Sequence, residues 1–284
     1  MASMRDIKRR RDSIASTQQI TKAMKLVSTV KLQRAKQNAE KSKTYFQAMY
    51  DTLHSILKKS PDIEHKYLKS GDSKKKGVIV ITSNRGLAGS YNSSIVKLIT
   101  RGELANEDLA IYAIGKKGRD ALARSYDIVK DYSECIDEPV YAEAMKISAQ
   151  VLSDFEEGKI GEIYLAYTSF KNTVSHIPTL LKLLPVEMTE TEGEEAEDTT
   201  PMNFEPDEEE ALDLLIPKYI TSLIYGGMVE AVASENGARM QAMDSATSNA
   251  EDMIQSLSLA YNRARQGSIT QELTEIIAGA NAIS

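Results

Sequence analysis

The feature that most constrains the fold of this chain is its first sixty residues, which contain no glycine and no proline. Ser3 and Asp6 have the spacing of a helix-capping box. Apolar residues then recur at the spacing of one helical face, at Ile20, Met24, Val27 and Val30. Within the segment 1–60, one helix from Asp6 to Ser60 would be about 80 Å long at 1.5 Å per residue. Since no compact domain of this size can enclose such a helix, the run predicts one strand of a coiled coil.

The other end of the chain repeats this pattern. Acidic residues at 207–210 follow Pro206, as suits the start of a helix, where the helix dipole is positive. Helical periodicity then continues over 207–284, about 110 Å if straight. It includes a stripe of small residues, namely Ala238, Ala242, Ala246 and Ala250. Two long helices at opposite ends of one chain predict an antiparallel pair.

The middle of the chain alternates between two kinds of segment. Short β-branched and aliphatic runs at 77–82, 109–114, 162–168 and 181–186 read as strands. Helical segments are expected at 93–105, 116–125 and 141–156. This alternation predicts an α/β, Rossmann-like domain at 77–186 with a mostly parallel sheet. An acidic loop at 187–206 would lead into the last helix. The predicted fold class is thus an α/β insert on a long antiparallel α-helical coiled coil.

Charge is unevenly distributed along the chain, although the net charge is only −6. Residues 1–45 contain twelve Lys or Arg and three acidic residues, whereas 187–213 contain thirteen acidic residues and no Lys or Arg. A basic first helix could meet an acidic protein surface or a nucleic acid. We favour the protein surface, because no parallel zipper follows the basic segment.

One turn invites a nucleotide-binding interpretation. The segment SNRGLAGSYNSS follows a predicted buried strand and carries Gly86 and Gly89. A phosphate-binding loop requires G-x-G-x-x-G, or a Gly-rich run that ends in Lys-Ser/Thr. Neither pattern is present, so we interpret the segment as a structural turn.

Other chemistry is equally weakly indicated. His54, His65 and His176 lie far apart in the sequence and lack a metal-ligand spacing. Cys135 is the single cysteine, which suggests a reducing compartment and an inert thiol. The sequence therefore predicts no catalytic residues, no metal and no cofactor.

The sequence carries no membrane-targeting signal that we can identify. Charged residues begin at Arg5, and no apolar stretch precedes them, so we expect no signal peptide. The stretch 219–229 is uncharged, but it is about half as long as a membrane-spanning helix requires.

The last helix contains cations without local partners. Arg239 has Glu235 one turn away, whereas Arg263 and Arg265 have no acidic residue three or four positions away on either side. The final stretch, IIAGANAIS, carries no charge after Glu275. We expect the two arginines to bind another chain and the apolar tip to enter an apolar socket.

The chain resembles the gamma subunit of bacterial F-type ATP synthases in four separate motifs. These are SMRDIKRR followed by TQQITKAMKLVSTVKLQRA, then SNRGLAGSYN, then ASENGARMQAMDSATSNA, and finally YNRARQGSITQELTEIIAGANA. The chain departs from the family pattern at Arg11, often an apolar position, and at Gly267, where Ala is usual. The regulatory cysteine pair of the chloroplast relatives has no counterpart.

The resemblance implies a rotor shaft that couples ion translocation to ATP synthesis or hydrolysis. The helical pair would turn inside a ring of alternating alpha and beta subunits, and the α/β domain would dock on the epsilon subunit and the c-ring. The nucleotide sites would belong to the alpha and beta subunits, so the chain itself would not be an enzyme.

The resemblance also implies where the contacts lie. Arg265, Gln266 and Thr270 match the family's contact to a beta-subunit loop, and Met24 would lie near an acidic lever of beta. The expected subunit-interface residues are Met24, Arg239, Arg263, Arg265, Gln266, Thr270 and Glu272. The chain would touch the cytoplasmic face of a bacterial cell membrane only through the complex, as a peripheral protein, and would bind no nucleic acid.

Two alternatives from the residues alone remain open. One is a cytosolic α/β enzyme with helical arms, which ligand binding by the isolated chain would support. The other is a coiled-coil scaffold or a basic-helix nucleic-acid binder, which a salt-sensitive DNA complex would support.

Overall fold

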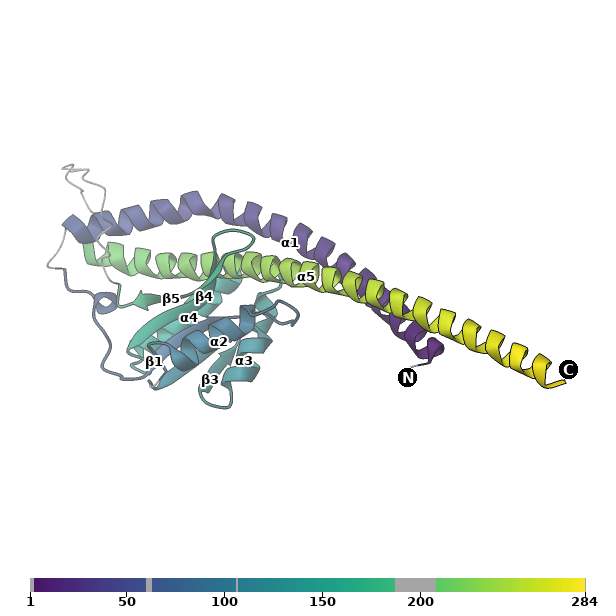
Figure 1. Ribbon diagram of the computed structural model, residues 1–284. Coiled ribbons are helices and arrows are strands. Elements are labelled where there is room, and N and C mark those ends of the chain that lie inside the picture. The colour runs from purple at the N-terminus through teal and green to yellow at the C-terminus, as the bar shows by residue number, and fades with distance from the viewer. Residues whose placement is uncertain (1–2, 60–62, 106, 187–207, 284) are drawn as a thin grey trace. The chain divides into compact units, whose positions relative to one another are not determined.

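The computed structural model describes residues 3–59, 63–105, 107–186 and 208–283. They form two compact units, one from Met1–Thr29 with Arg239–Ser284 and one from Val30–Ala238 (Figure 1). The elements in chain order are α1 (Met4–Lys59), η1 (Lys66–Leu68), β1 (Lys76–Ile81), α2 (Tyr91–Arg101), β2 (Leu109–Ile114), α3 (Lys116–Leu122), β3 (Asp127–Asp131), η2 (Ser133–Cys135), α4 (Tyr141–Glu156), β4 (Glu162–Phe170), β5 (His176–Leu184) and α5 (Glu208–Ile283). Both long helices predicted for the chain ends are confirmed. The acidic loop predicted at 187–206 lies outside the described residues.

The second unit contains a five-stranded sheet with the order β3-β2-β1-β4-β5. β1 pairs in parallel with β2 and with β4, β2 pairs in parallel with β3, and β4 pairs antiparallel with β5. The prediction of a mostly parallel sheet is therefore correct. No strand was predicted at β3, and the last strand was predicted at 181–186, whereas β5 begins at His176.

The two faces of the sheet pack against different helices. Along β1, Val78 and Val80 face a core that includes side chains of α2 and α3. Ile79 and Ile81 face the opposite core, to which α1, α4 and α5 contribute. Figure 1 shows α2 and α3 together on one side of the sheet. The strand is buried on both faces, which is why its sequence is a continuous apolar run.

Within the second unit, α1 and α5 run antiparallel and contact each other through aromatic rings. The ring centroids of Phe46 and Tyr225 are 6.4 Å apart, and those of Tyr50 and Tyr219 are 6.5 Å apart. Gly227 brings α5 close to the sheet, since a Cβ there would lie 3.0 Å from Cδ2 of Leu165.

In the first unit, the ends of α1 and α5 form an antiparallel coiled coil. Half-buried or buried positions recur every three or four residues, at 7, 11, 14, 18, 21, 25 and 28 in α1 and at 240, 243, 247, 250, 254, 257, 261, 264 and 268 in α5. This is the spacing of a heptad repeat. At the start of α1, the amide of Asp6 donates to Oγ of Ser3 over 3.3 Å, and the Ser3 hydroxyl donates back to the Asp6 carboxylate over 3.0 Å, as the capping-box spacing predicted.

The seam of this coiled coil is not the apolar face noted in the sequence. The side chains of Ile20, Val27 and Val30 are 57%, 58% and 52% exposed, whereas Thr21 and Ser28 are 9% and 2% exposed. In this part of the helix, Thr21 and Ser28 therefore face the partner helix, while Ile20, Val27 and Val30 lie outside the seam. On α5 the alanine stripe borders the seam, with Ala250 only 7% exposed.

Candidate functional site

Two pairs of side chains fix the register of the coiled coil. The hydroxyl oxygens of Thr21 and Thr247 are 2.8 Å apart, and the Lys25 ammonium lies 2.6 Å from the carboxylate of Asp244. A hydrogen bond at a half-buried seam position is lost if either helix slides, so the pair specifies one alignment.

Arg11 has a definite role in this seam. Its guanidinium lies 5.8 Å from the centroid of the Tyr261 ring and also contacts the carboxylate of Asp12 at 3.0 Å. The arginine stem covers apolar surface while the charged end stacks on the ring.

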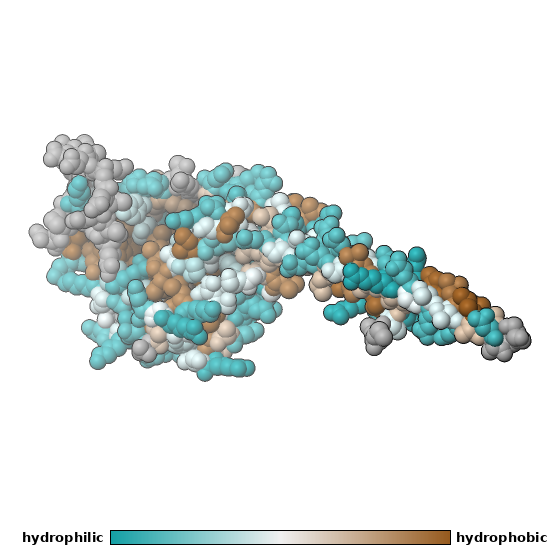
Figure 2. Space-filling view, viewed as in Figure 1, coloured by the Kyte–Doolittle hydropathy of each residue, from teal (hydrophilic) through white to brown (hydrophobic). Residues whose placement is uncertain are grey.

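The last turns of α5 have a different character. Every described residue from 269 to 281 is exposed. The large apolar residues among them are Ile269, Leu273, Ile276 and Ile277, which are 47%, 55%, 68% and 59% exposed. Figure 2 shows this hydrophobic band near the C-terminal end. Such a band in water is typical of a surface that another protein covers.

The predicted interface residues lie in two groups. Met24 and Arg239 are half-buried, on α1 and α5 respectively. Five others are exposed along the last part of α5, namely Arg263, Arg265, Gln266, Thr270 and Glu272. The Thr270 hydroxyl donates to the backbone oxygen of Gln266 over 2.9 Å, so this hydrogen bond does not involve the Gln266 side chain.

Neither Arg263 nor Arg265 forms an ion pair within the described residues. This agrees with the local sequence, which offers no carboxylate one turn away. An exposed guanidinium keeps five donors available in a planar fork that matches a carboxylate. The terminal segment thus combines two available cations with an apolar band.

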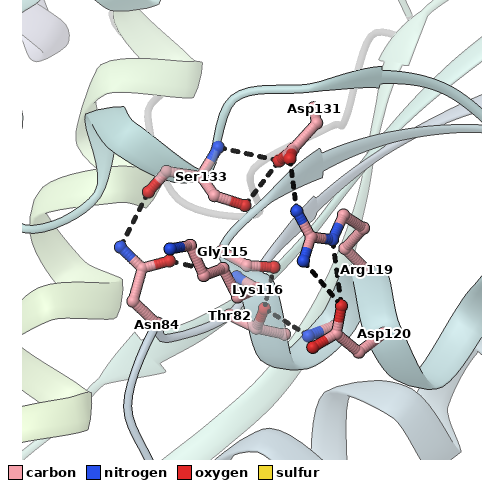
Figure 3. A network of polar contacts seen from close by, with 9 residues as sticks. Thr82, Asn84, Gly115, Lys116, Arg119, Asp120, Asp131 and Ser133 are labelled. Carbon is pink, nitrogen blue, oxygen red and sulfur yellow. Dashed lines mark hydrogen bonds and ion pairs between the residues drawn. The ribbon is translucent and has the colours of Figure 1, made fainter.

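In the second unit, the carboxyl ends of the strands carry a polar network, shown in Figure 3. Gly115 has a φ of 110° and follows β2, and its backbone oxygen accepts from the hydroxyl of Thr82 over 3.2 Å. The same hydroxyl accepts from the amide of Gly118 over 2.8 Å. Thr82 therefore ties the end of β1 to the start of α3.

Asn84 and Asp131 extend the network toward β3. The Asn84 amide group donates to the backbone oxygen of Ser133 over 2.7 Å and accepts from the Lys116 amide over 3.1 Å. Asp131 accepts from Nη1 of Arg119 over 2.7 Å and from the Ser133 amide over 2.9 Å. Burial raises the pKa of Asp131, but these hydrogen bonds outweigh it, so the pKa is lowered. The carboxylate is thus held ionised as a structural anchor.

The turn after β1 is internally satisfied as well. The Ser83 amide donates to Oδ1 of Asn92 over 2.9 Å, and Nδ2 of Asn92 donates to Oγ of Ser83 over 2.8 Å. The Lys117 amide donates to the Ser83 backbone oxygen over 3.1 Å. Residues 82–84 of this turn therefore engage the first three amides of α3.

Cys135 lies in an environment that suppresses its reactivity. Its thiol is half-buried and donates to Oε2 of Glu143 over 3.3 Å. Burial, followed by this carboxylate, raises the pKa of the thiol to about 11. At pH 8 the thiolate population is then on the order of a thousandth.

We therefore expect Cys135 to react slowly with Ellman's reagent at pH 8 in the native chain and rapidly after unfolding in urea. Glu143→Gln removes the negative charge, lowers the thiol pKa and accelerates the native reaction about threefold or more. Stopped-flow absorbance measures both rates. Equal rates in native and unfolded chains would show that the thiol is not protected.

Metal-binding clusters and membrane-spanning helices also bear on function. Among the residues that the structure describes, no three or more His, Cys, Asp or Glu side chains gather where they could hold a metal ion. In the same residues, no helix combines the length and the apolar character that crossing a bilayer requires.

The sequence analysis identified the terminal cations but missed the seam contacts. Nothing in the composition marks Thr21 and Thr247 as partners, because they lie 226 residues apart. The available signal was confined to α1, where the small polar residues Thr21 and Ser28 lie seven positions apart.

Comparison with known proteins gives consistent matches. Residues 3–283 match the family model described as ATP synthase. The chain is 66% identical to the "ATP synthase gamma chain" of Lachnoclostridium phytofermentans, with 100% of both chains covered. It is 39% identical to the "ATP synthase gamma chain, sodium ion specific" of Acetobacterium woodii, with 99% of both covered.

Solved structures agree with these matches. A chain from the central stalk and c-ring of the Tetrahymena thermophila mitochondrial ATP synthase is 26% identical, with a TM-score of 0.59, over 80% of this chain and 99% of that one. A chain of the Euglena gracilis mitochondrial ATP synthase shares the fold at 18% identity, with a TM-score of 0.57, over 92% of this chain and 95% of that one.

Proposed function

This chain belongs to the ATP synthase gamma-chain family, and from that premise we propose that it is a non-catalytic rotor shaft. It transmits torque between a membrane c-ring and a ring of alpha and beta subunits, and the nucleotide sites belong to those subunits. The helices at 1–60 and 207–284 form the shaft, the domain at 77–186 forms the foot that docks on epsilon and the c-ring, and 187–206 link the two.

The observation that supports this proposal most strongly is the exposed end of α5. A shaft shifts the state of a neighbouring subunit only if its contacts differ in free energy between the states. Arg263 and Arg265 offer charge without a partner in the described chain, and the adjacent band at Ile269 and Leu273 is exposed and apolar. A helix end of this kind is asymmetric around its axis, as torque transmission requires.

In this proposal, the interface residues have distinct roles. Arg265, with Gln266 and Thr270, contacts a loop of beta, and Met24 lies near an acidic lever of the same subunit. Arg239, Arg263 and Glu272 contact the surrounding ring. The chain is peripheral at the cytoplasmic face of the cell membrane and reaches the membrane only through its complex.

The nucleic-acid alternative finds no support in the basic helix. Arg9 lies 3.5 Å from Asp6, and Lys25 pairs with Asp244, so part of its charge is already neutralised within the chain. Exposed Lys and Arg on a helix are also the ordinary solvated surface of a coiled coil.

Affinity purification from detergent-solubilised membranes tests the proposal. With a tag on this chain, we expect the alpha, beta, epsilon and c subunits to co-purify with ATP hydrolysis activity. If the chain is recovered alone, or if an equally active complex is recovered from cells that lack it, the assignment is wrong.

The non-catalytic role gives a separate prediction for the purified full-length chain. We expect calorimetry to detect no micromolar binding of ATP or ADP, because the turn SNRGLAGSYN lacks the residues of a phosphate-binding loop. A micromolar nucleotide site on this chain would contradict the structural interpretation of the turn.

A further inference from the structure

The second unit contains a cavity of about 590 Å³ that no part of the rotor function uses. Residues of α1, β4, β5 and α5 line it, and most of its walls are apolar. Three aromatic side chains face it, namely Phe46 of α1 and Tyr167 and Phe170 of β4. A cavity of this volume with aromatic walls is of the kind that holds small organic ligands.

Two small residues on the α5 side of the cavity let the neighbouring side chains approach this helix. Gly226 and Gly227 both line it. A Cβ at Gly226 would stand 3.2 Å from the Phe46 ring, so the glycine lets that ring lie against the helix backbone. Two of the four phenylalanines in the chain, Phe46 and Phe170, therefore line the same cavity as the Gly-Gly pair.

The charged groups of the cavity carry a net charge of −1. Lys36, Glu40 and Glu230 line it. The Glu230 carboxylate accepts a hydrogen bond from the Phe170 amide over 3.2 Å, which holds it at the edge of the aromatic wall. Burial and then the negative charge of Glu230 raise the pKa of Tyr167 to about 12. Glu230 therefore places a negative charge near Tyr167.

One wall of the cavity already receives a cation. The Lys36 ammonium lies 5.0 Å from the centroid of the Phe170 ring. This is the distance at which a positive charge is attracted to the face of an aromatic ring. Lys36 therefore occupies the cation position on Phe170, and the two carboxylates still exceed the one lysine in the cavity.

A second cavity of about 160 Å³ adjoins the first. It shares Phe46, Ser222 and Leu223 with the first cavity and continues toward Tyr50 and Tyr219. An apolar group that extends from the first cavity would find further ring surface there.

From these contacts we propose that the cavity binds an amphipathic organic monocation. Its positive head lies against Tyr167, beside Glu230 and Glu40, and its apolar part lies against Phe46 and Leu223. The binding is separate from the subunit contacts proposed for α5, because every lining residue lies between Lys36 and Ala233.

Calorimetry with the full-length chain and benzyltriethylammonium tests this proposal, with benzyl alcohol as the neutral probe and benzenesulfonate as the anionic probe. We expect the cation to bind about tenfold more tightly than either, since a desolvated cation–π contact with a carboxylate supplies a factor of this size. Glu230→Gln keeps an acceptor for the Phe170 amide and should weaken cation binding about fivefold or more, with little effect on benzyl alcohol.

A filling variant tests the position of the site. Ala39 lines the cavity from a half-buried position on α1, so Ala39→Leu places a larger side chain in the cavity. This variant should abolish binding of both the cation and the alcohol. Matched controls on α5 are Ala260→Leu and Glu251→Gln, which change exposed residues outside the cavity and should leave affinity unchanged. Circular dichroism establishes that each variant is folded.

Equal affinity for the cation and the alcohol would overturn the proposal, since it would show an apolar void without charge selection. So would the absence of binding by any probe. Retention of cation affinity in a folded Ala39→Leu variant would place the ligand elsewhere on the chain.

Discussion

Replacing both Arg265 and Gln266 with alanine should leave the composition of the ATP synthase complex unchanged while lowering its turnover about tenfold. Both side chains are exposed on the free chain, and Arg265 has no ion pair within the described residues. In the proposed assembly the guanidinium gains a carboxylate on a beta-subunit loop. A hydrogen bond to a charged group contributes about 1.5–3 kcal/mol when water is excluded, whereas a fully wet pair contributes less than about 1 kcal/mol.

The effect falls on rate because a turning shaft makes and breaks this contact in each cycle. A contact present in only some rotational states changes the relative free energies of those states. About 1.4 kcal/mol in a barrier corresponds to a tenfold change in rate. Assembly, by contrast, depends on many contacts, and losing two exposed side chains changes it little.

Steady-state hydrolysis and proton- or sodium-driven synthesis by purified complexes measure this prediction. Arg265→Lys keeps the charge but loses the planar pair of donors, and we expect it to recover only part of the rate. The matched control is Arg10→Ala with Gln19→Ala, which removes the same residue types from exposed positions of α1. If the Arg265 and Gln266 variant runs at the full rate in both directions, these residues are solvated helix surface.

The sequence predicts the long helices and the central strands well because their signals are local. The absence of Gly and Pro before residue 60 indicates α1, and the buried run from Gly77 to Ile81 indicates β1. The missed strand β3 has the sequence DIVKD. Four of its five residues are exposed, and the fifth, Ile128, is half-buried. A short edge strand of this kind has neither an apolar run nor a clear alternation. The start of β5 was also missed, since Pro178 and His176 are unusual strand residues.

The coiled-coil seam shows what periodicity cannot determine. Ile20 and Val27 lie on one apolar stripe, yet they are more than half exposed, and Thr21 and Ser28 are buried. The spacing of apolar residues identifies a helix, but it does not show which of several partners the apolar face of that helix contacts. In the proposed complex, Thr21 and Ser28 lie where the two helices of the shaft meet, and the stripe of Ile20 and Val27 is available to the surrounding subunits.

Replacement of Gly115 by alanine is expected to destabilise the foot by about 3–5 kcal/mol in the free energy of unfolding. Gly115 has a φ of 110°, which L side chains rarely adopt, and a Cβ there would lie 2.1 Å from the backbone oxygen of Thr82. Backbone strain of this kind costs about 1–3 kcal/mol. Moving the backbone to relieve the clash would also break the Thr82 hydrogen bonds to Gly115 and Gly118, each worth about 1 kcal/mol.

Gly267→Ala is the matched control, because the same methyl group meets nothing within 4 Å on α5. In a helix interior it should stabilise by about 0.5–1 kcal/mol, since glycine loses more backbone entropy on folding than alanine does. Urea unfolding followed by circular dichroism, with hydrogen exchange across 109–122, measures both variants. Gly115→Ala should accelerate exchange at the start of α3, where Gly118 loses its acceptor, and Gly267→Ala should leave those amides unchanged. Equal protection of α3 in the two variants would show that the Thr82 network does not hold the foot together at this edge of its sheet.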